Sequence, residues 1–89
     1  MISPEFTFDS EMNGYVSEPF GVTEHAMVHI ELAKRAPVVT LRQEADGGWA
    51  NYGQSPESHE GYEIDITCKD ELQLMLATPV EVTKCWVIN

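Results

Sequence analysis

The sequence predicts an all-β fold, a small antiparallel β-sandwich of about seven strands. Apolar and polar residues alternate with a period of two in several short runs, most clearly over 26–32 and 62–68, and this period is typical of half-buried strands. Glycine and proline fall between these runs at intervals of about 8–12 residues, as they do in sandwiches. A chain of 89 residues has the size of one domain, so residues 1–89 are expected to form a single sandwich.

The first elements are short. The run 6–8 alternates and predicts a strand, and the run 11–14 ends in Asn-Gly, which favours a turn. Residues 15–20 are extended in character but contain Pro19. Because proline lacks a backbone N–H, it is confined within sheets to edges and interruptions. We therefore expect 15–20 to be an edge segment.

The run 26–32 is the clearest strand. Four apolar side chains fall on one face, which we expect to enter the core: Ala26, Val28, Ile30 and Leu32. The opposite face is expected to point to solvent or to a site, and it carries His25, Met27, His29 and Glu31.

A hairpin is predicted in the middle of the chain. Residues 38–44 are rich in β-branched side chains, and residues 49–52 follow as the returning strand. The Asp-Gly-Gly stretch between them suits a tight turn, because these residues accept a positive φ. The loop could hold two residues, 46–47 or 47–48, or three residues, 46–48.

The loop length decides which aromatic side chain of this hairpin is exposed. A two-residue loop would place Trp49 beside Arg42 on the exposed face and Tyr52 with Leu41. A three-residue loop with a bulge would reverse the faces, because a shift of one residue turns every side chain over. Trp49 would then join Leu41 in the core, and Tyr52 would be exposed.

Three further strands are predicted after a polar loop over 53–61. The run 62–68 alternates strictly, and the run 72–76 alternates leucine with Gln and Met. The last strand covers 80–88, and its alternation slips near Thr83-Lys84, which indicates a bulge. The side chains of 62–68 expected to point inward are Tyr62, Ile64, Ile66 and Cys68.

A short helix over 70–77 is the alternative for one of these strands. This stretch contains good helix formers and begins with Asp70, a residue type that caps helices. Such a helix would make the fold α+β. The apolar spacing of two, rather than three or four, favours the strand.

The outline resembles an immunoglobulin-like domain, in architecture only. The chain lacks the pair of cysteines with a tryptophan between them that is usual in that family. Its two cysteines are too few for a disulfide scaffold. Whether Cys68 and Cys85 are bridged stays open, because the sequence does not show whether their Cβ atoms face each other.

The acidic composition excludes some classes of partner. Fifteen acidic residues against five basic ones give a net charge of −10. Repulsion from phosphates opposes direct nucleic-acid binding, and it disfavours anionic membranes for the same reason. No apolar run is long enough to cross a bilayer. The first residues lack the pattern of a signal peptide, which favours a cytoplasmic location, with a removed signal as the alternative.

No catalytic or metal-binding constellation is convincing. His25, His29 and Glu31 share a strand face, and His59 or Glu60 could add ligands. However, residues four apart on a strand are separated by roughly 13 Å, too far for one ion without a bend. The chain has no G-x-S-x-G elbow, P-loop or G-x-G-x-x-G motif. We therefore predict no enzyme activity, no metal and no cofactor.

The aromatic hairpin is the candidate binding site. Flat aromatic rings near amides can cover the apolar faces of sugars or peptides and bond their polar groups. We predict a non-enzymatic binding or assembly module for a protein or carbohydrate partner, which could form homo-oligomers or belong to a larger extracellular or phage structure. The alternative is an acidic inhibitor or nucleic-acid mimic that binds a basic protein. The predicted ligand-binding residues are Arg42, Trp49, Asn51, Tyr52 and Gln54.

Overall fold

The computed structural model describes residues 1–55 and 60–89, and these residues form strands and turns with no helix. The strands of the described residues are β1 (Phe6–Asp9), β2 (Gly14–Ser17), β3 (Phe20–Val22), β4 (His25–Leu32), β5 (Val39–Gln43), β6 (Trp49–Gln54), β7 (Gly61–Thr67), β8 (Asp70–Leu76) and β9 (Val82–Ile88). The predicted loop over 53–61 begins later than expected, because β6 continues to Gln54. Its residues 56–59 lie outside the described part of the chain.

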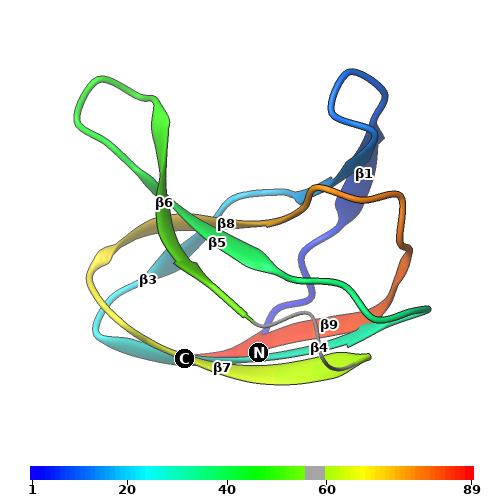
Figure 1. Cartoon of the computed structure of the whole chain (residues 1–89). Helices are drawn as coiled ribbons and strands as arrows, with labels where there is room; N and C mark the ends of the chain where they lie inside the picture. The colour runs from blue at the N-terminus through cyan, green and yellow to red at the C-terminus, as the bar shows by residue number, and fades with distance from the viewer. Residues whose placement is uncertain (56–59) are drawn as a thin grey trace.

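The strands form two antiparallel sheets, which confirms the predicted sandwich. The larger sheet has the order β1-β2-β8-β5-β6, with β3 also paired to β8, and the smaller sheet has the order β7-β4-β9. Figure 1 shows the larger sheet lying over the smaller one. The β1–β2 and β5–β6 hairpins project from the larger sheet, away from the smaller one (Figure 1).

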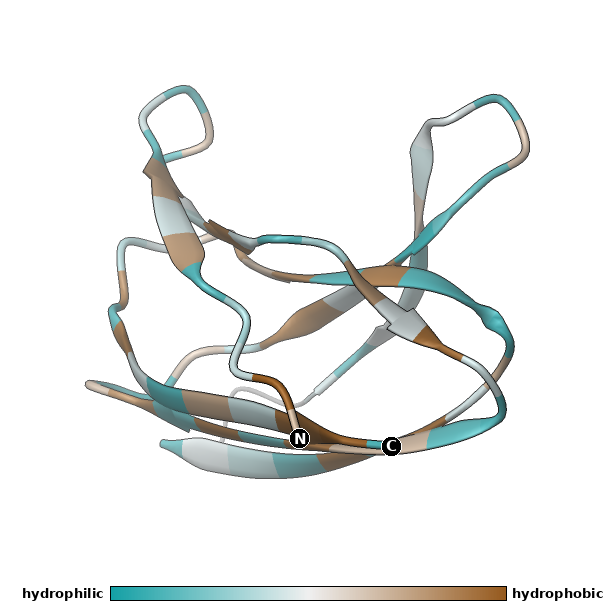
Figure 2. Ribbon diagram, turned by 180° about the vertical axis from the view of Figure 1, so that it is seen from behind, coloured by the Kyte–Doolittle hydropathy of each residue, from teal (hydrophilic) through white to brown (hydrophobic). Residues whose placement is uncertain are grey.

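The core lies between the inner faces of the two sheets. The predicted inward face of β4 is confirmed, since Ala26, Val28 and Ile30 are fully buried. On β7, Ile66 is buried, and Tyr62 and Ile64 pack against the core while partly exposed. Cys68, just after the strand, does the same. Figure 2 shows this alternation of hydrophobic and hydrophilic residues along the strands, and the mainly hydrophilic tips of the two hairpins.

Strand β8 shows that the alternative of a helix over 70–77 is wrong. Leu72, Leu74 and Leu76 are all fully buried on one face of β8. A spacing of two spreads side chains around a helix but aligns them on one face of a strand. The strand conformation therefore buries all three leucines together.

A break between β2 and β3 confirms that 15–20 is interrupted near Pro19. The expectation that this segment lies at a sheet edge is wrong for β2, which pairs with β1 on one side and β8 on the other. Both short strands pair with the same edge of β8, β2 at its end and β3 at its start. Between them, the buried Ser17 Oγ accepts a hydrogen bond from the Leu74 N–H (2.9 Å) and donates one to the Glu18 carbonyl (2.9 Å). A side chain thus replaces the missing backbone partner. This division also makes the number of strands larger than the expected seven.

The predicted bulge near Thr83-Lys84 is confirmed. Along β9, Lys84 pairs with Glu31, whereas Val82 pairs with Leu32, so Thr83 is the extra residue. The Thr83 hydroxyl donates to the Glu31 carbonyl (3.1 Å). The strand begins at Val82 rather than Val80.

Replacing Ser17 with alanine should destabilise the fold. The Leu74 N–H would lose its partner in a buried position, which costs about 1–3 kcal/mol. Chemical denaturation of Ser17→Ala should therefore show a lower midpoint, with Ser10→Ala, at an exposed position, as the control. An unchanged midpoint for Ser17→Ala would contradict this role of the hydroxyl.

Two glycines should respond oppositely to alanine. A Cβ at Gly14 would overlap the Leu76 carbonyl oxygen, whereas a Cβ at Gly53 meets nothing within 4 Å. Gly14→Ala should therefore cost roughly 1–3 kcal/mol, as overpacking does, and Gly53→Ala should be neutral or slightly stabilising. Thermal unfolding of the two variants checks this, and equal melting temperatures would refute it.

Candidate functional site

The β5–β6 turn is a three-residue loop. The Glu44 N–H donates to the Gly48 carbonyl (2.8 Å), and the Gly47 N–H donates back to the Glu44 carbonyl (3.0 Å). The loop therefore consists of Ala45, Asp46 and Gly47, one residue earlier than the three-residue alternative. Gly47 has a φ of 89°, the left-handed conformation that glycine accepts in such hairpins.

This loop places Trp49 on the face of Leu41, but that face is not the core. Trp49 pairs with Gln43, two residues from Leu41. The neighbouring Thr40 pairs with the buried Leu74, so Leu41 and Trp49 point to the outer face of the larger sheet, because successive side chains alternate. Both are partly exposed. The three-residue alternative is therefore right that Trp49 shares the face of Leu41 but wrong that this face enters the core, because it is the outer face of the larger sheet.

Tyr52 is exposed, as the three-residue alternative predicts. Asn51 pairs with Leu41 and Gly53 pairs with Thr40, so Tyr52 is the extra residue of a bulge in β6. Bulges re-aim side chains. Tyr52 is 40% exposed, and its hydroxyl donates to the Thr67 carbonyl at the end of β7 (3.3 Å).

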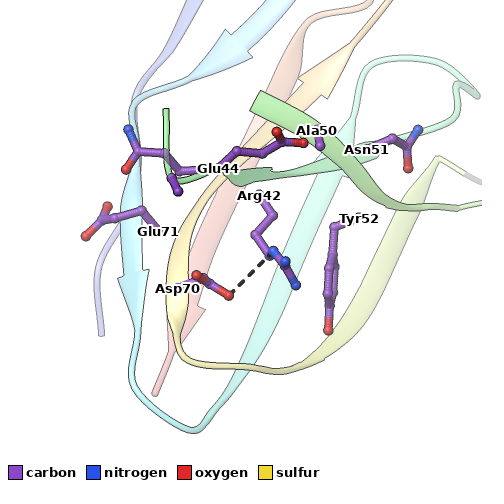
Figure 3. Close-up of a pocket in the computed structure, with 9 residues that line it drawn as sticks. Arg42, Glu44, Ala50, Asn51, Tyr52, Asp70 and Glu71 are labelled. Carbon is purple, nitrogen blue, oxygen red and sulfur yellow. Dashed lines mark ion pairs between the residues drawn. The ribbon is translucent and has the colours of Figure 1, made fainter. Parts of the chain in front are cut away.

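An open cavity of about 730 Å³ lies between this hairpin and the start of β8. We call it the hairpin cavity. In Figure 3 the Arg42 side chain lies between the Asp70 carboxylate and the Tyr52 ring. Arg42 Nε is 3.6 Å from Asp70 Oδ2, and both side chains are partly exposed. The lining residues are Arg42, Gln43, Glu44, Ala45, Ala50, Asn51, Tyr52, Asp70 and Glu71.

Three of the five predicted ligand-binding residues meet at the hairpin cavity. Arg42, Asn51 and Tyr52 all line it, but the Asn51 side chain points away from Arg42 and Tyr52 (Figure 3), because Asn51 shares the outer face with its partner Leu41. Trp49 does not line it, because it points to the outer face of the sheet. Gln54 lies in a second cavity of about 360 Å³ between β6 and β7, which Tyr52 also lines.

The acidic side of the hairpin cavity was not predicted from the sequence. Glu44 lies at the hairpin turn, while Asp70 and Glu71 are the first two residues of β8. They reach the cavity because β8 pairs with β5, placing Leu72 opposite Arg42. No local signal in the sequence indicates this pairing of distant strands. The Glu71 side chain points away from Arg42 (Figure 3), toward Gly21 on the outer face of β8. The carboxylates on the Arg42 side of the cavity are therefore those of Asp70 and Glu44, and they favour ligands with hydroxyl or ammonium donors.

The histidines of β4 contact different carboxylates. His25 Nε2 lies 3.0 Å from Asp65 Oδ1. His29 Nε2 lies 2.8 Å from Glu31 Oε2, and the His29 ring stacks on Trp86 at 4.3 Å. The hydrogen bond with His29 lowers the pKa of Glu31, against a smaller opposing effect of burial.

These contacts form no metal centre. Among residues 1–55 and 60–89, no group of three or more His, Cys, Asp or Glu side chains could hold a metal ion. His59, a candidate fourth ligand, lies outside the described residues.

Both cysteines are free thiols and partly exposed. Burial raises the pKa of Cys85 to about 11. Burial also raises the pKa of Cys68, with the nearby Asp70 charge adding to the effect. Thiolates, not thiols, are the nucleophiles, so neither cysteine is activated for nucleophilic attack.

No protein-family model matches the chain, and neither the curated proteins nor the solved structures contain a match. Within the described residues, no helix has the length and apolar character needed to span a membrane.

Alkylation of Cys85 should be slow. A pKa of about 11 leaves roughly one thiol in a thousand ionised at pH 8, so the rate should fall about 100-fold below that of an unperturbed cysteine. Iodoacetamide labelling followed by mass spectrometry measures it, with unfolded protein in urea as the control. Equal rates in folded and unfolded protein would contradict the raised pKa.

Proposed function

We propose that the chain is a non-enzymatic binding module that holds its partner at the projecting β5–β6 hairpin. The hairpin cavity carries this proposal, because it brings Arg42 and Tyr52 together with the Asp70 carboxylate in one open space (Figure 3). The hairpin projects beyond the sandwich (Figure 1), so a partner can reach it without displacing the core.

A neutral carbohydrate matches this lining best. The exposed Tyr52 ring offers a flat apolar face for sugar C–H groups. The Arg42–Asp70 pair supplies a guanidinium that donates hydrogen bonds and a carboxylate that accepts them. Sugar hydroxyl groups both donate and accept hydrogen bonds, so they satisfy this mixed set. A protein loop that presents hydroxyl or ammonium groups is the second class of partner.

The open geometry supports binding rather than catalysis. Arg42 is 51% exposed and Asp70 is 36% exposed, whereas catalytic sites gain from excluding water. The lining contains no serine, cysteine or histidine. An open site of this size binds weakly alone, so several copies in one assembly would raise the avidity.

An acidic inhibitor that binds a basic protein is the second candidate function. The observation that favours it is the smaller sheet, whose outer face carries the exposed carboxylates of Glu63 and Asp65 beside Glu31. With a net charge of −10, association with a basic partner would slow steeply as salt increases. Carbohydrate binding at the hairpin would be nearly independent of salt, which separates the two functions.

Loss of the Tyr52 ring should abolish most carbohydrate binding. Removing an aromatic platform should cost about 1–2 kcal/mol, or roughly 5- to 30-fold in affinity. We would titrate a panel of neutral mono- and disaccharides and follow amide shifts by NMR. Wild-type shifts should cluster on residues 42–52 and on Asp70, and they should weaken in Tyr52→Ala.

The matched control is Phe8→Ala on the other projecting hairpin, because Phe8 is similarly exposed (46%). It should bind like the wild type. If no saccharide shifts the hairpin amides, or if Phe8→Ala and Tyr52→Ala bind equally, carbohydrate recognition at this hairpin is refuted.

A further inference from the structure

The two edge strands of the smaller sheet, β9 and β7, differ in whether their outer backbone groups are hydrogen-bonded. At the β9 edge, Ile2 and Val87 exchange two backbone hydrogen bonds (3.0 and 2.7 Å), so the N-terminal segment covers this edge. At the other edge, β7 pairs only with β4 among the described residues. Unpaired strand edges are templates for a further strand.

The register shows which backbone groups of β7 point away from β4. The Leu32 N–H donates to the Glu60 carbonyl (2.6 Å), so every second residue after Glu60 forms a hydrogen-bonded pair with β4. Glu63 and Asp65 alternate with these hydrogen-bonded residues, so their backbone N–H and C=O groups point away from β4. The bond from Tyr52 to the Thr67 carbonyl agrees, because Thr67 alternates in the same way and Tyr52 lies on β6.

A groove runs beside this edge. The cavity of about 360 Å³ between β6 and β7 has apolar side chains on its β7 side, Ile64 and Ile66, and Tyr52 on its β6 side. We call it the edge groove. On the other face of β7, the side chains of Glu63 and Asp65 are 69% and 68% exposed.

The two faces of β7 define the strand that would fit. Side chains of an added strand alternate between the faces of the sheet. One set would enter the edge groove against Ile64 and Ile66, so it must be apolar. The other set would lie beside Glu63 and Asp65, where opposite charges across strands stabilise pairing and like charges destabilise it.

A second copy of this chain does not fit. Pairing β7 with another β7 would place the negative carboxylates of Glu63 and Asp65 of the two copies close to one another, and this repulsion would destabilise the pairing. The net charge of −10 on each copy would add to the repulsion. We propose instead that an extended segment of a partner protein, alternating apolar and basic residues, adds as a strand to the open edge of β7. This site shares Tyr52 with the hairpin cavity but binds through the backbone of β7, so it does not depend on the proposed carbohydrate binding.

The test uses a short synthetic peptide that alternates valine and lysine, with capped ends, and a matched peptide that alternates valine and glutamate. Added to the full chain, the lysine peptide should protect the amides of Glu63 and Asp65 from hydrogen exchange. The amides of Ile64 and Ile66 should change little, because they already bond to β4. The glutamate peptide should not bind.

Removing the charges of Glu63 and Asp65 should weaken binding of the lysine peptide. The double variant Glu63→Gln, Asp65→Asn should bind about five- to tenfold more weakly, the size expected for two partly exposed ion pairs. The charge-matched control Glu11→Gln, Glu81→Gln changes exposed residues elsewhere and should bind normally. Asn51→Ala, which alters the hairpin cavity alone, should also bind normally.

Asp65→Pro tests the backbone directly. It removes an N–H that faces away from β4, so the sheet should survive, and peptide binding should be lost. If this variant does not fold, the protection pattern and the charge variants still decide. Equal binding of both peptides, or binding without protection of Glu63 and Asp65, would overturn the proposal.

Discussion

The pairing of β8 on both of its edges is the constraint on which the larger sheet depends. One edge of β8 bonds β2 and β3, and the other edge bonds β5. Its buried leucines fix which face points inward, and a slip of one residue would turn that face to solvent. At the gap between β2 and β3, the Ser17 hydroxyl accepts a hydrogen bond from the N–H of Leu74, 57 positions away in the sequence. Contacts of such long range make folding slow, because the chain must close large loops before they form.

The sequence predicted those parts of the fold in which each strand buries one face. The alternation in β4 and β7 identified their inward residues, and the slip near Thr83 identified a bulge. The same alternation favoured β8 over a helix. These signals are local. When every second residue of a strand is apolar, the alternation fixes which face of the strand enters the core.

The candidate site was only partly predictable, because it depends on long-range pairing. Arg42, Asn51 and Tyr52 belong to one hairpin, so a local argument could bring them together. Asp70 enters through the β5–β8 register, which no neighbouring residue indicates. The three-residue alternative placed Trp49 in the core, which is wrong, because the chain around β5 carries apolar side chains on both faces: Val38, just before β5, is buried, while Leu41 points outward. Strands that are apolar on both faces do not show which face is the core.

The bridge between Ile2 and Val87 has a practical consequence for how the molecule can be attached to a surface. It brings the two ends of the described chain together on the smaller sheet, while both hairpins project from the opposite side (Figure 1). The two termini therefore lie on one side of the molecule, and the two hairpins lie on the opposite side. A tether or a fused domain joined at either terminus would therefore leave the hairpins accessible on the opposite side of the molecule.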